Sequence, residues 1–557
     1  MNQTRRDLST LTAQPYDVIV VGAGIYGSVV ALRLAEAGLR TLVIDQGDFC
    51  SATSANSLKI LHGGLRYLQH LNIKRMRETI ASRRHLMQFS PHLVQPLACM
   101  IPTAGHGFRS RPIMRVASLL NNLISADRNR ELPPFIHLPG GGTVKRRELL
   151  DQIPGCPEQD PSGGVVWHDG LAVNSERLAL EHLLMARDLG ASLCNYLRAD
   201  RVTVADNRVV GVEVTDLACG GSDQVRAPWV INAAGPWFDD LLARSGIAAP
   251  PTRWAKAVNV VVRKPLNERF AVGIEGQAGY QDQDAVVKRG KRFFFFVPWQ
   301  GGTMIGTTYH AWTGAKDALR CDRADIEEIL SEVNAIYPAW GLRTEDVTFF
   351  HVGLLPMADG CDEAAGTVQL AKHSLLVDHG ALGGPAGLVS LRSIKYTTAP
   401  AEADKVVRLI AGGNPNGKQM PPAKPVGWLA ATPEQAALQP MLEQRYGRWA
   451  GQVLRHLGGN DPAAWWLHRQ PDLLVAEIRY FLAEEMAQTL ADVVFRRTNL
   501  GAFSRPSTAL LARIAEVMAA ELDWDQERQA REIAQVEAVY APLPSEQAQT
   551  LARDTHP

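Results

Sequence analysis

The chain has 557 residues, of which 21% are charged, and its 58 Lys and Arg residues balance 58 Asp and Glu residues. This length is too great for a single hydrophobic core and predicts two or three domains. The balanced charge excludes the basic surface typical of nucleic-acid-binding proteins, and no apolar run reaches the ~18 residues of a membrane-spanning helix. The seven cysteines show no CxxC pair and no metal-ligand spacing, which favours free thiols in a reducing compartment and predicts no metal site.

Residues 1–15 are predicted to form a disordered tail. Arg5 and Arg6 weakly resemble a twin-arginine export signal, but the residues from Ser9 to Tyr16 are largely polar and do not form the hydrophobic region of a leader. We therefore expect a cytoplasmic protein.

A glycine-rich turn between two apolar strands organises the N-terminal region. Residues 18–21 form a short strand, a helix follows as far as Gly38, and a second strand, residues 41–44, ends at Asp45. The glycines of the turn have GxGxxG spacing: Gly22, Gly24 and Gly27. Such a turn brings backbone amides to a pyrophosphate, and the acid accepts hydrogen bonds from a ribose hydroxyl. A turn without a ligand is the alternative, but the flanking strands and the acid favour dinucleotide binding.

Residues 51–68 combine small hydroxyl side chains, two adjacent glycines, cations and a phenol. Small side chains can lie against a cofactor without a clash, and Lys59, His62 and Arg66 can donate hydrogen bonds. The alternative is a capped helix beside an ordinary core segment, which accounts for the hydroxyls but not for the cluster of donors. The candidate site residues of this segment are Thr53, Ser54, Ser57, Lys59, His62, Gly63, Gly64, Arg66 and Tyr67.

Residues 109–124 are basic at Arg109, Arg111 and Arg115, and their apolar residues fall near helical spacing. On the sequence alone, a helix packed on a neighbouring domain is the simpler interpretation.

The nucleotide-binding pattern returns beyond residue 165. A β-hairpin is expected around Asp206–Asn207, and a buried strand over residues 229–232. Small residues at the carboxyl end of a parallel strand let the backbone touch a cofactor. The candidates here are Ala234 and Gly235, with a simple strand exit as the alternative.

Residues 253–310 are rich in strand patterns and predict an antiparallel sheet on the substrate side of a pocket. The run Phe293–Phe296 is expected to lie in its core. A later helix is expected from Thr398, which supplies a hydroxyl cap and is followed by a proline in the first turn. The N-terminus of that helix suits an anion, although an ordinary capped helix is the simpler reading.

Residues 412–427 have the composition of a linker. Beyond them, Thr432–Gln435 forms a capping box, and apolar residues recur at helical spacing over residues 472–495. A helical C-terminal domain is expected, with a structural or oligomer-forming role that makes a homodimer one candidate assembly.

Six segments carry further motifs: Ala52–Lys59, His62–Leu68, Ser90–Leu93, Trp229–Trp237, Val297–Trp299 and Ile305–Thr308. With these motifs the chain resembles the FAD-dependent glycerol-3-phosphate dehydrogenases, within the larger group of glycine/D-amino-acid-oxidase-like flavoproteins. The resemblance covers nearly the whole chain. It implies FAD rather than NAD, an α/β Rossmann-like FAD-binding domain, an antiparallel β-rich substrate domain and an all-helical C-terminal domain.

The domain boundaries follow from this assignment. The FAD-binding domain is expected in three parts, 16–95, 151–248 and 351–411. The remaining parts are a substrate- or membrane-facing insertion (96–150), the β-rich substrate domain (249–350), the linker (412–427) and the C-terminal domain (428–545).

The resemblance also implies roles for individual residues. Arg66 and Lys395 are the cations expected at the substrate, with His62 and Tyr67 beside them. Hydride would pass to flavin N5, and His62 is the proposed proton acceptor, since imidazole titrates near neutral pH. Lys395 is its rival, and a purely structural contact of His62 with the flavin is an equally open alternative. Thr397 and Thr398 are implied to face the flavin.

Two positions depart from the family pattern. The family has Gly-Val-Arg-Pro, where the arginine is expected to bind the substrate phosphate, but Leu355 stands at that place. The family follows Gly-Thr-Thr with aspartate, and this chain has Tyr309. Leucine cannot reproduce the bidentate recognition of phosphate by a guanidinium group. A divergent member with a changed substrate is therefore predicted.

The leading hypothesis is an FAD-dependent dehydrogenase of glycerol 3-phosphate or a related polyol phosphate or hydroxy acid, which passes electrons to a quinone or another acceptor. An FAD-dependent amine or amino-acid oxidase is the alternative. A non-catalytic flavoprotein module is disfavoured because Arg66 and Lys395 are retained. The family further implies a peripheral contact of residues 109–124 with the inner face of the cytoplasmic membrane, which a basic amphipathic helix suits.

Overall fold

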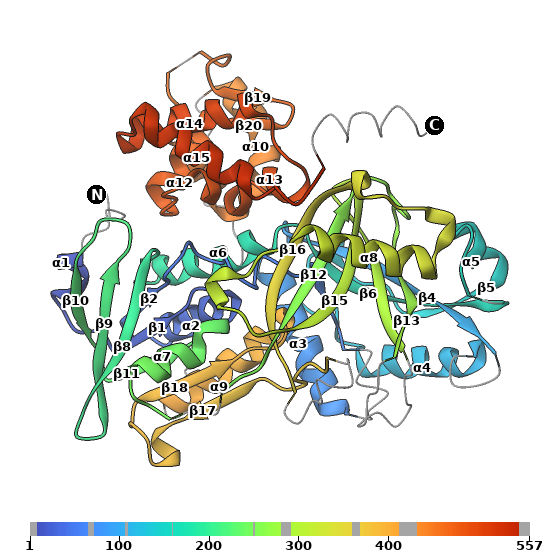
Figure 1. Cartoon of the computed structure of the whole chain (residues 1–557), viewed down its shortest axis with the longest axis horizontal. Coiled ribbons are helices and arrows are strands. Elements are labelled where there is room, and N and C mark those ends of the chain that lie inside the picture. The colour runs from blue at the N-terminus through green and yellow to red at the C-terminus, as the bar shows by residue number, and fades with distance from the viewer. Residues whose placement is uncertain are drawn as a thin grey trace.

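The computed structural model describes residues 8–64, 72–105, 110–158, 160–248, 251–279, 291–358, 368–411, 432–459 and 461–544. Figure 1 shows a broad body built around two large sheets and, above it, a separate group of helices from the C-terminal part of the chain. The predicted combination of a Rossmann-like α/β domain, a β-rich domain and a helical C-terminal domain is thereby confirmed.

The first sheet contains six strands, and the glycine turn follows one of them. Its elements are β1 (Val18–Val21), β2 (Thr41–Ile44), β7 (Ser192–Cys194), β11 (Trp229–Asn232), β17 (Leu375–Asp378) and β18 (Leu388–Arg392). They lie in the order β17-β18-β11-β1-β2-β7, with only the β17–β18 pair antiparallel. β1 and β2 are buried along their whole length, as expected of apolar strands in a parallel sheet covered on both faces.

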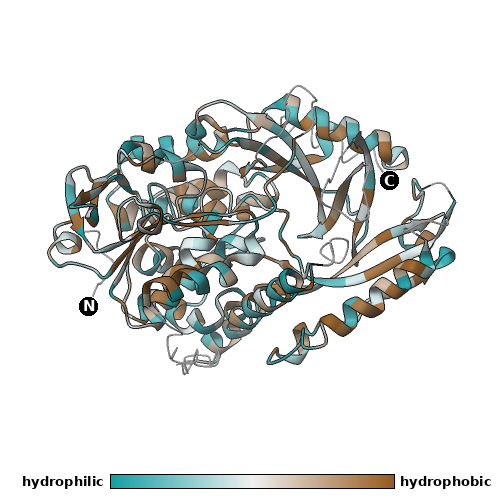
Figure 2. Ribbon diagram, turned by 90° about the horizontal axis from the view of Figure 1, so that it is seen from below, coloured by the Kyte–Doolittle hydropathy of each residue, from teal (hydrophilic) through white to brown (hydrophobic). Residues whose placement is uncertain are grey.

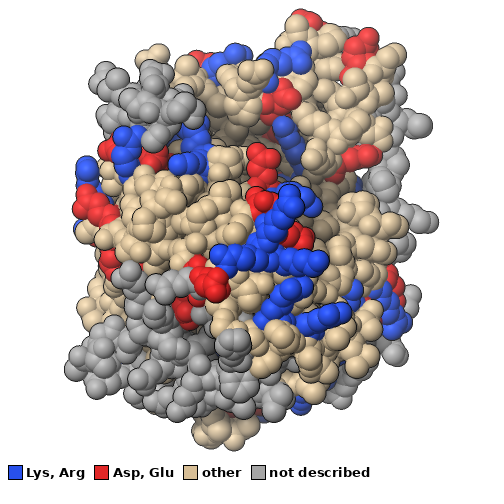
Figure 3. Space-filling view, turned by 90° about the vertical axis from the view of Figure 1, so that its right-hand side faces the viewer, with Lys and Arg blue, Asp and Glu red and all other residues tan. Residues whose placement is uncertain are grey.

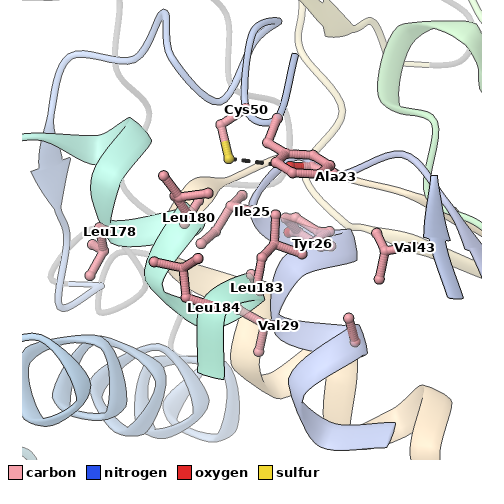
Figure 4. Packing of buried hydrophobic residues seen from close by; sticks show 14 of the residues in the cluster. Ala23, Ile25, Tyr26, Val29, Val43, Cys50, Leu178, Leu180, Leu183 and Leu184 are labelled. Atoms are coloured by element: carbon pink, nitrogen blue, oxygen red, sulfur yellow. Dashed lines mark hydrogen bonds between the residues drawn. The ribbon is translucent and has the colours of Figure 1, made fainter. Parts of the chain in front are cut away.

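Three helices pack together beside this sheet: α2 (Ile25–Glu36), α6 (Ser175–Asp188) and α9 (Ala399–Ala411). α2 follows the glycine turn and contacts both α6 and α9. Figure 4 shows Leu180, Leu183 and Leu184 of α6 beside Ile25 and Val29 of α2. This buried contact fixes the N-terminus of α2 at the carboxyl end of β1.

Local predictions near this sheet are largely confirmed. Gly38 has a φ of 80° and ends α2, as a glycine at this position should. The predicted hairpin joins β8 (Leu197–Ala205) to β9 (Arg208–Asp216), and β10 (Ser222–Arg226) completes a three-stranded sheet. The predicted disordered tail is wrong for residues 8–12, which form helix α1 (Leu8–Thr12) against β10.

The second sheet contains nine strands and forms the β-rich body on the right of Figure 1. Its strands are β3 (Ile60–Leu61), β4 (Val94–Ala104), β5 (Gly142–Lys145), β6 (Pro161–Ala172), β12 (Trp254–Val262), β13 (Phe270–Gly279), β14 (Lys291–Trp299), β15 (Gly302–Trp312) and β16 (Val347–Pro356). All pairs except β4–β13 are antiparallel. Helix α8 (Arg323–Ile336) covers one face.

The phenylalanine run in β14 is only half in the core. Phe294 and Phe296 are buried against α8 and its neighbours, whereas Phe293 and Phe295 line a cavity on the other face of the sheet. The prediction of a wholly buried run is therefore wrong, because successive residues of a strand point to opposite faces.

Three helices cover the lower and right-hand edges: α3 (Ile73–Phe89), α4 (Arg111–Ile124) and α5 (Arg146–Gln152). α4 packs on β5 and β6, but Ser118 is its one buried residue. Several of its large apolar side chains face outward, with Leu119 62% and Leu123 74% exposed. Packing on a neighbouring domain thus fails to account for the apolar face of α4, which Figure 2 shows in brown.

The C-terminal domain consists mainly of helices: α10 (Pro433–Tyr446), α11 (Ala450–Leu454), α12 (Val475–Glu484), η11 (Asp492–Arg497), α13 (Leu500–Phe503), α14 (Thr508–Leu522) and α15 (Gln526–Ala538). The hydroxyl of Thr432 caps α10 by accepting a hydrogen bond from the amide of Gln435. A short hairpin, β19 (Trp466–Arg469) and β20 (Asp472–Leu474), interrupts the helices. Among the described residues, no helix is long and apolar enough to cross a membrane.

Candidate active site

A cavity of 1710 Å³ extends from the glycine turn to the second sheet. Its volume exceeds the ~300–1,000 Å³ typical of ligand pockets. Gly22, Gly24 and Asp45 line one end, which we call the nucleotide end. Tyr309 and Leu355 belong to the other, which we call the substrate end.

Gly22 and Gly27 are required by the backbone that surrounds them. Gly22 has a φ of 100°, and a Cβ there would lie 2.5 Å from the carbonyl oxygen of Ala233. A Cβ on Gly27 would lie 1.8 Å from the oxygen of Gly22. Gly24 caps α2 and lies against Ser54, whose hydroxyl accepts a hydrogen bond from the amide of Ile25 at 3.0 Å. The turn therefore admits no Cβ at Gly22 or Gly27, and at Gly22 and Gly24 it leaves backbone at the cavity surface.

Asp45 lies at the end of β2 and lines the cavity. Its Oδ2 accepts a hydrogen bond from the amide of Ala23 at 2.7 Å, and its Oδ1 accepts one from the amide of Gly47 at 2.9 Å. Burial raises the pKa of Asp45 to about 6 in spite of these two bonds. Each carboxylate oxygen has a second lone pair, so the arrangement suits ribose hydroxyls.

The loop after Asp45 is fixed by the C-terminal domain. Arg497 donates to both oxygens of Asp48 at 2.8 and 2.9 Å, and Arg496 donates to Oδ2 at 2.5 Å. Asn195 adds a bond to Oδ1 at 3.0 Å. Burial alone would raise the pKa of Asp48, but the charges of Arg497 and Arg496 outweigh it and lower the pKa to about 2. No local sequence pattern indicated this contact.

The hydroxyl-rich segment divides into two groups. Thr53, Ser54 and Ser57 line the cavity, and the Thr53 hydroxyl donates to the carbonyl oxygen of Leu354 at 3.1 Å. Lys59 does not line it. Its ammonium group is buried and bonded to Glu176 at 2.9 Å and to Ser175 at 2.8 Å, so its role as a cofactor donor is corrected to that of a structural ion pair.

His62 lines the cavity, and its side chain is 46% exposed there. Its Nδ1 lies 3.1 Å from Oδ2 of the buried Asp169. Asp169 also accepts hydrogen bonds from Trp167 Nε1 at 3.0 Å and from Arg83 at 2.6 Å. Burial alone would raise the pKa of Asp169, but the bond from His62 and the charge of Arg83 lower it to about 2. Sequence reasoning missed Asp169, since it is 107 positions from His62.

The glycines after His62 differ in role. Gly64 has a φ of 85° and lines the cavity. Gly63 does not line it. Its amide donates to Asp169 at 2.6 Å, and a Cβ on it would lie 2.2 Å from the guanidinium group of Arg83. Gly63 is thus corrected from a cofactor contact to a packing position. Arg66 and Tyr67 lie outside the described residues.

Ala234 and Gly235 line the cavity beyond the end of β11, next to the glycine turn. The amide of Ala233 donates to the carbonyl oxygen of Val21 at 2.9 Å. Three further lining residues at the nucleotide end, which sequence reasoning did not identify, come from the ends of β2 and β8: Gln46, Arg198 and Ala199. No local sequence pattern indicates Arg198 and Ala199, because β8 begins 153 positions after the end of β2.

Lys395 and Thr397 line the cavity, whereas Thr398 does not. The Thr398 hydroxyl is buried and lies 2.7 Å from the hydroxyl of Tyr26. Tyr26 also donates to the carbonyl oxygen of Lys395 at 2.9 Å. Thr398 is therefore corrected to a residue that joins α9 to α2, and Tyr26 is a support of the site that sequence reasoning missed.

Leu355 and Tyr309 both line the substrate end. They lie on β16 and β15, on either side of β12, where Ala257 is the register partner of Tyr309 and Ala255 that of Leu355. Glu275, Phe293 and Phe295 line the same cavity from β13 and β14. The residues just named are thus aromatic and aliphatic, apart from the carboxylate of Glu275.

Comparison with known proteins adds independent findings. A family model described as FAD dependent oxidoreductase matches residues 17–389, and one described as the C-terminal domain of alpha-glycerophosphate oxidase matches residues 423–529. The glycerol-3-phosphate dehydrogenase of Synechocystis sp. is 27% identical over 552 residues, which cover 94% of this chain and 96% of that protein. That of Mycobacterium leprae is 28% identical over 540 residues, covering 94% and 87%.

A solved structure shares the fold along the whole chain. The X-ray structure of the glycerol-3-phosphate dehydrogenase from Bacillus halodurans, complexed with FAD, matches with a TM-score of 0.69 and 22% identity, covering 97% of this chain and 98% of its own. The cofactor of the present chain is FAD. The backbone that Gly22 and Gly24 leave at the cavity surface and the two acceptor oxygens of Asp45 fit its pyrophosphate and ribose.

Proposed function

The chain belongs to the family of FAD-dependent oxidoreductases, and on this premise we propose that it is a dehydrogenase of a secondary alcohol that carries an anionic group. Glycerol 3-phosphate, a related polyol phosphate and a hydroxy acid are the candidate substrates. The observation that carries the proposal is the hydrogen-bonded pair of His62 and the buried Asp169 at the cavity. The names of the relatives support the same class.

Removal of a hydride from an alcohol carbon requires a group that accepts the hydroxyl proton. Asp169 can accept a hydrogen bond from Nδ1–H of His62, and this tautomer leaves Nε2 as the proton acceptor. The ionised Asp169 then stabilises the imidazolium that forms. Gly63, Arg83 and Trp167 hold Asp169 in place. Bound FAD supplies the hydride acceptor.

We further propose that the electrons leave to a membrane quinone. The cavity is lined by Ile113, Met114 and Ala117 of α4, the helix whose apolar side chains Val116, Leu119, Leu120 and Leu123 are exposed. An apolar acceptor held in a lipid surface could reach the cavity along this helix. Exposed Lys145, Arg146 and Arg147 lie on β5 and α5 beside α4, at the end of the molecule where Figure 3 shows basic side chains gathered.

The contact with a membrane surface has its own test. The purified protein should co-float with vesicles that contain anionic phospholipid, and it should bind neutral vesicles less tightly because the basic residues then contribute nothing. No binding to either vesicle would remove the membrane from the proposal but leave the alcohol chemistry untouched.

One observation favours a second candidate function. Glu275 lines the substrate end together with Phe293, Phe295 and Tyr309, and a carboxylate among aromatic rings can bind an ammonium group. An FAD-dependent amine or amino-acid oxidase is therefore the alternative.

The deciding experiment is an anaerobic reduction assay on the yellow holoenzyme. Glycerol 3-phosphate, other polyol phosphates, hydroxy acids and amines are added in turn, and bleaching of the flavin absorption bands is measured. Bleaching by an alcohol with an anionic group is the expected result. Bleaching by amines alone would replace the proposal with its alternative, and bleaching by none of them would favour a flavoprotein without this chemistry.

A further inference from the structure

One loop of the FAD-binding part connects the two ends of the cavity. Most of residues 52–58, which we call the cofactor loop, line the cavity. The Ser54 hydroxyl accepts a hydrogen bond from the amide of Ile25 at the nucleotide end. The Thr53 hydroxyl donates to the carbonyl oxygen of Leu354 on β16, at the substrate end. FAD bound at the glycine turn therefore has to extend past this loop to bring its flavin ring to the substrate end.

A buried ion pair supports the cofactor loop from outside the cavity. Lys59 and Glu176 are 1% and 2% exposed, and neither lines the cavity. Nζ of Lys59 donates to the carbonyl oxygen of Ala55 in the loop at 2.7 Å and to Oε1 of Glu176 at 2.9 Å. The positively charged member of the pair is thus in direct contact with the backbone of the loop.

Ser175 connects the ion pair to a second segment of the cavity wall. Its hydroxyl accepts a hydrogen bond from Lys59 at 2.8 Å and lies 3.2 Å from the carbonyl oxygen of Ser54. Its own carbonyl oxygen accepts a hydrogen bond from the hydroxyl of Tyr396 at 2.6 Å, and Tyr396 lines the cavity. The first turn of α6 therefore holds two segments of the wall together with the ion pair.

Three titratable neighbours of the pair carry no charge near neutral pH. Burial raises the pKa of Cys50 and of Tyr396, and it lowers the pKa of His351. Burial also lowers the pKa of Lys59, and the charge of Glu176 opposes that shift. A charge in such surroundings acts over a longer distance than it does in water, because little solvent screens it. Loss of either member of the pair would thus leave a weakly screened charge beside the cofactor loop.

We propose that Lys59, held by Glu176, is a positioning residue that sets the reduction potential of the bound flavin. Its ammonium group presents positive charge to the cofactor loop. Positive charge near the flavin favours the reduced form, because reduction adds negative charge to the ring. Glu176 limits this effect through its opposite charge. The inference concerns the cofactor whichever substrate reduces it, so it goes beyond the proposed function and does not depend on it.

The reduction potential of the flavin tests the proposal without turnover. The holoenzyme is reduced slowly and anaerobically together with a dye of known potential, and each variant is compared with the unchanged protein at the same pH. Glu176→Gln keeps the shape of the side chain and removes its charge. It should raise the potential at about pH 6, where an ammonium group with a lowered pKa keeps its proton more readily.

Lys59→Met should have the opposite effect. It is measured at about pH 8.5, where a buried carboxylate ionises more readily, and it should lower the potential because the charge of Glu176 is then unopposed. In each variant we expect the reduction equilibrium to change by about tenfold, which is about 30 mV for two electrons. The double variant with Lys59→Met and Glu176→Gln removes both charges and should lie between the two single variants.

Lys256→Met is the matched control. Lys256 pairs with Asp325 of α8 at 2.6 Å, both side chains are at most 10% exposed, and neither lines the cavity. This variant also leaves a carboxylate without its lysine, so it reproduces the loss of an ion pair at a place remote from the cofactor loop. It should change the reduction equilibrium by less than about twofold, or about 10 mV.

Shifts of opposite sign in Glu176→Gln and Lys59→Met would support the proposal. Shifts in the same direction, or no larger than that of Lys256→Met, would overturn it and leave the pair as a support of the loop. Should Lys59→Met lose its flavin, Glu176→Gln decides alone: a higher potential supports the proposal, and an unchanged or lower one overturns it. If the opposite shifts are found but no alcohol reduces the flavin, the proposed function fails and this inference stands.

Discussion

Different kinds of groups line the two ends of the cavity. At the nucleotide end, backbone lines the cavity at positions where a Cβ would clash, and each buried charged group has several hydrogen-bond partners. The substrate end consists of side chains from β13 to β16, from α3, from segments near Lys395 and from the residues after β3, where the His62 side chain is 46% exposed. A residue at the second end can be exchanged without moving the fold, so this is where members of one family can diverge in substrate.

The largest effect is expected at the nucleotide end, from Gly27→Ala. The new Cβ would lie 1.8 Å from the carbonyl oxygen of Gly22, and that backbone cannot move without opening the turn. We expect the variant to lose most of its bound FAD and to unfold at a lower temperature, measured by the ratio of flavin to protein absorbance and by thermal unfolding.

Gly38→Ala is the control for Gly27→Ala. Gly38 has a positive φ, but a Cβ there meets nothing within 4 Å, so the cost is limited to ~1–2 kcal/mol of backbone strain. FAD content should stay normal. A Gly27→Ala protein with normal FAD content would show that the nucleotide end tolerates substitutions as well as the substrate end does.

At the substrate end, Asp169→Asn should slow the chemical step and leave the cofactor bound. The neutral amide cannot stabilise an imidazolium at His62. We expect the anaerobic rate of flavin reduction to fall by about 10²–10⁴, while the flavin spectrum stays unchanged.

The double variant with His62→Gln sharpens this test. Because the two residues act as a unit, the second substitution should add little to the first. Additive losses, or a loss of less than about threefold for Asp169→Asn, would contradict the proposed pair and leave His62 as a structural contact.

A smaller effect at the nucleotide end is expected from Arg497→Met. Arg497 is buried and holds both oxygens of Asp48, three positions after Asp45. Its loss should loosen the loop, weaken FAD binding by about tenfold and lower the stability by ~3–5 kcal/mol, while turnover per bound flavin is unchanged.

Arg479→Met is the matched control for Arg497→Met. Arg479 pairs with Glu521 in the same domain, and the two side chains are 37% and 41% exposed, so water reaches this pair. An exposed pair contributes ~1 kcal/mol or less, so FAD affinity should not change. Equal FAD affinity in both variants would mean that the C-terminal domain does not support the nucleotide end.

Sequence separation explains which parts of the site could be predicted from the sequence. The glycine turn, Asp45 and the Asp206–Asn207 hairpin are local, because the constraint and the residue that satisfies it lie within one or two elements. Lys59 was misassigned because its partner Glu176 is 117 positions away. Nothing local could predict that Arg497 contacts Asp48 across 449 positions.

The last prediction concerns the pH dependence of the nucleotide end. In the FAD-free protein, the pKa of Asp45 is raised by burial to about 6. Ribose hydroxyls donate to the ionised carboxylate, and protonation removes acceptor capacity. FAD affinity should therefore fall severalfold as the pH drops from 7 to 5, measured by titrating the apoprotein and following the flavin fluorescence.

The stability of the FAD-free protein should respond in the opposite sense. At pH values between the ordinary aspartate pKa of 3.8 and the raised pKa of about 6, the folded state holds more protons at Asp45 than the unfolded chain does. The free energy of unfolding contributed by this group must then decrease as the pH rises through that window. Asp45→Asn has no titrating group and should remove both dependences together. If the pH dependence of FAD binding survived in Asp45→Asn, it would have to originate from another group. The Asp45 carboxylate would then not be the hydrogen-bond acceptor for the ribose hydroxyls.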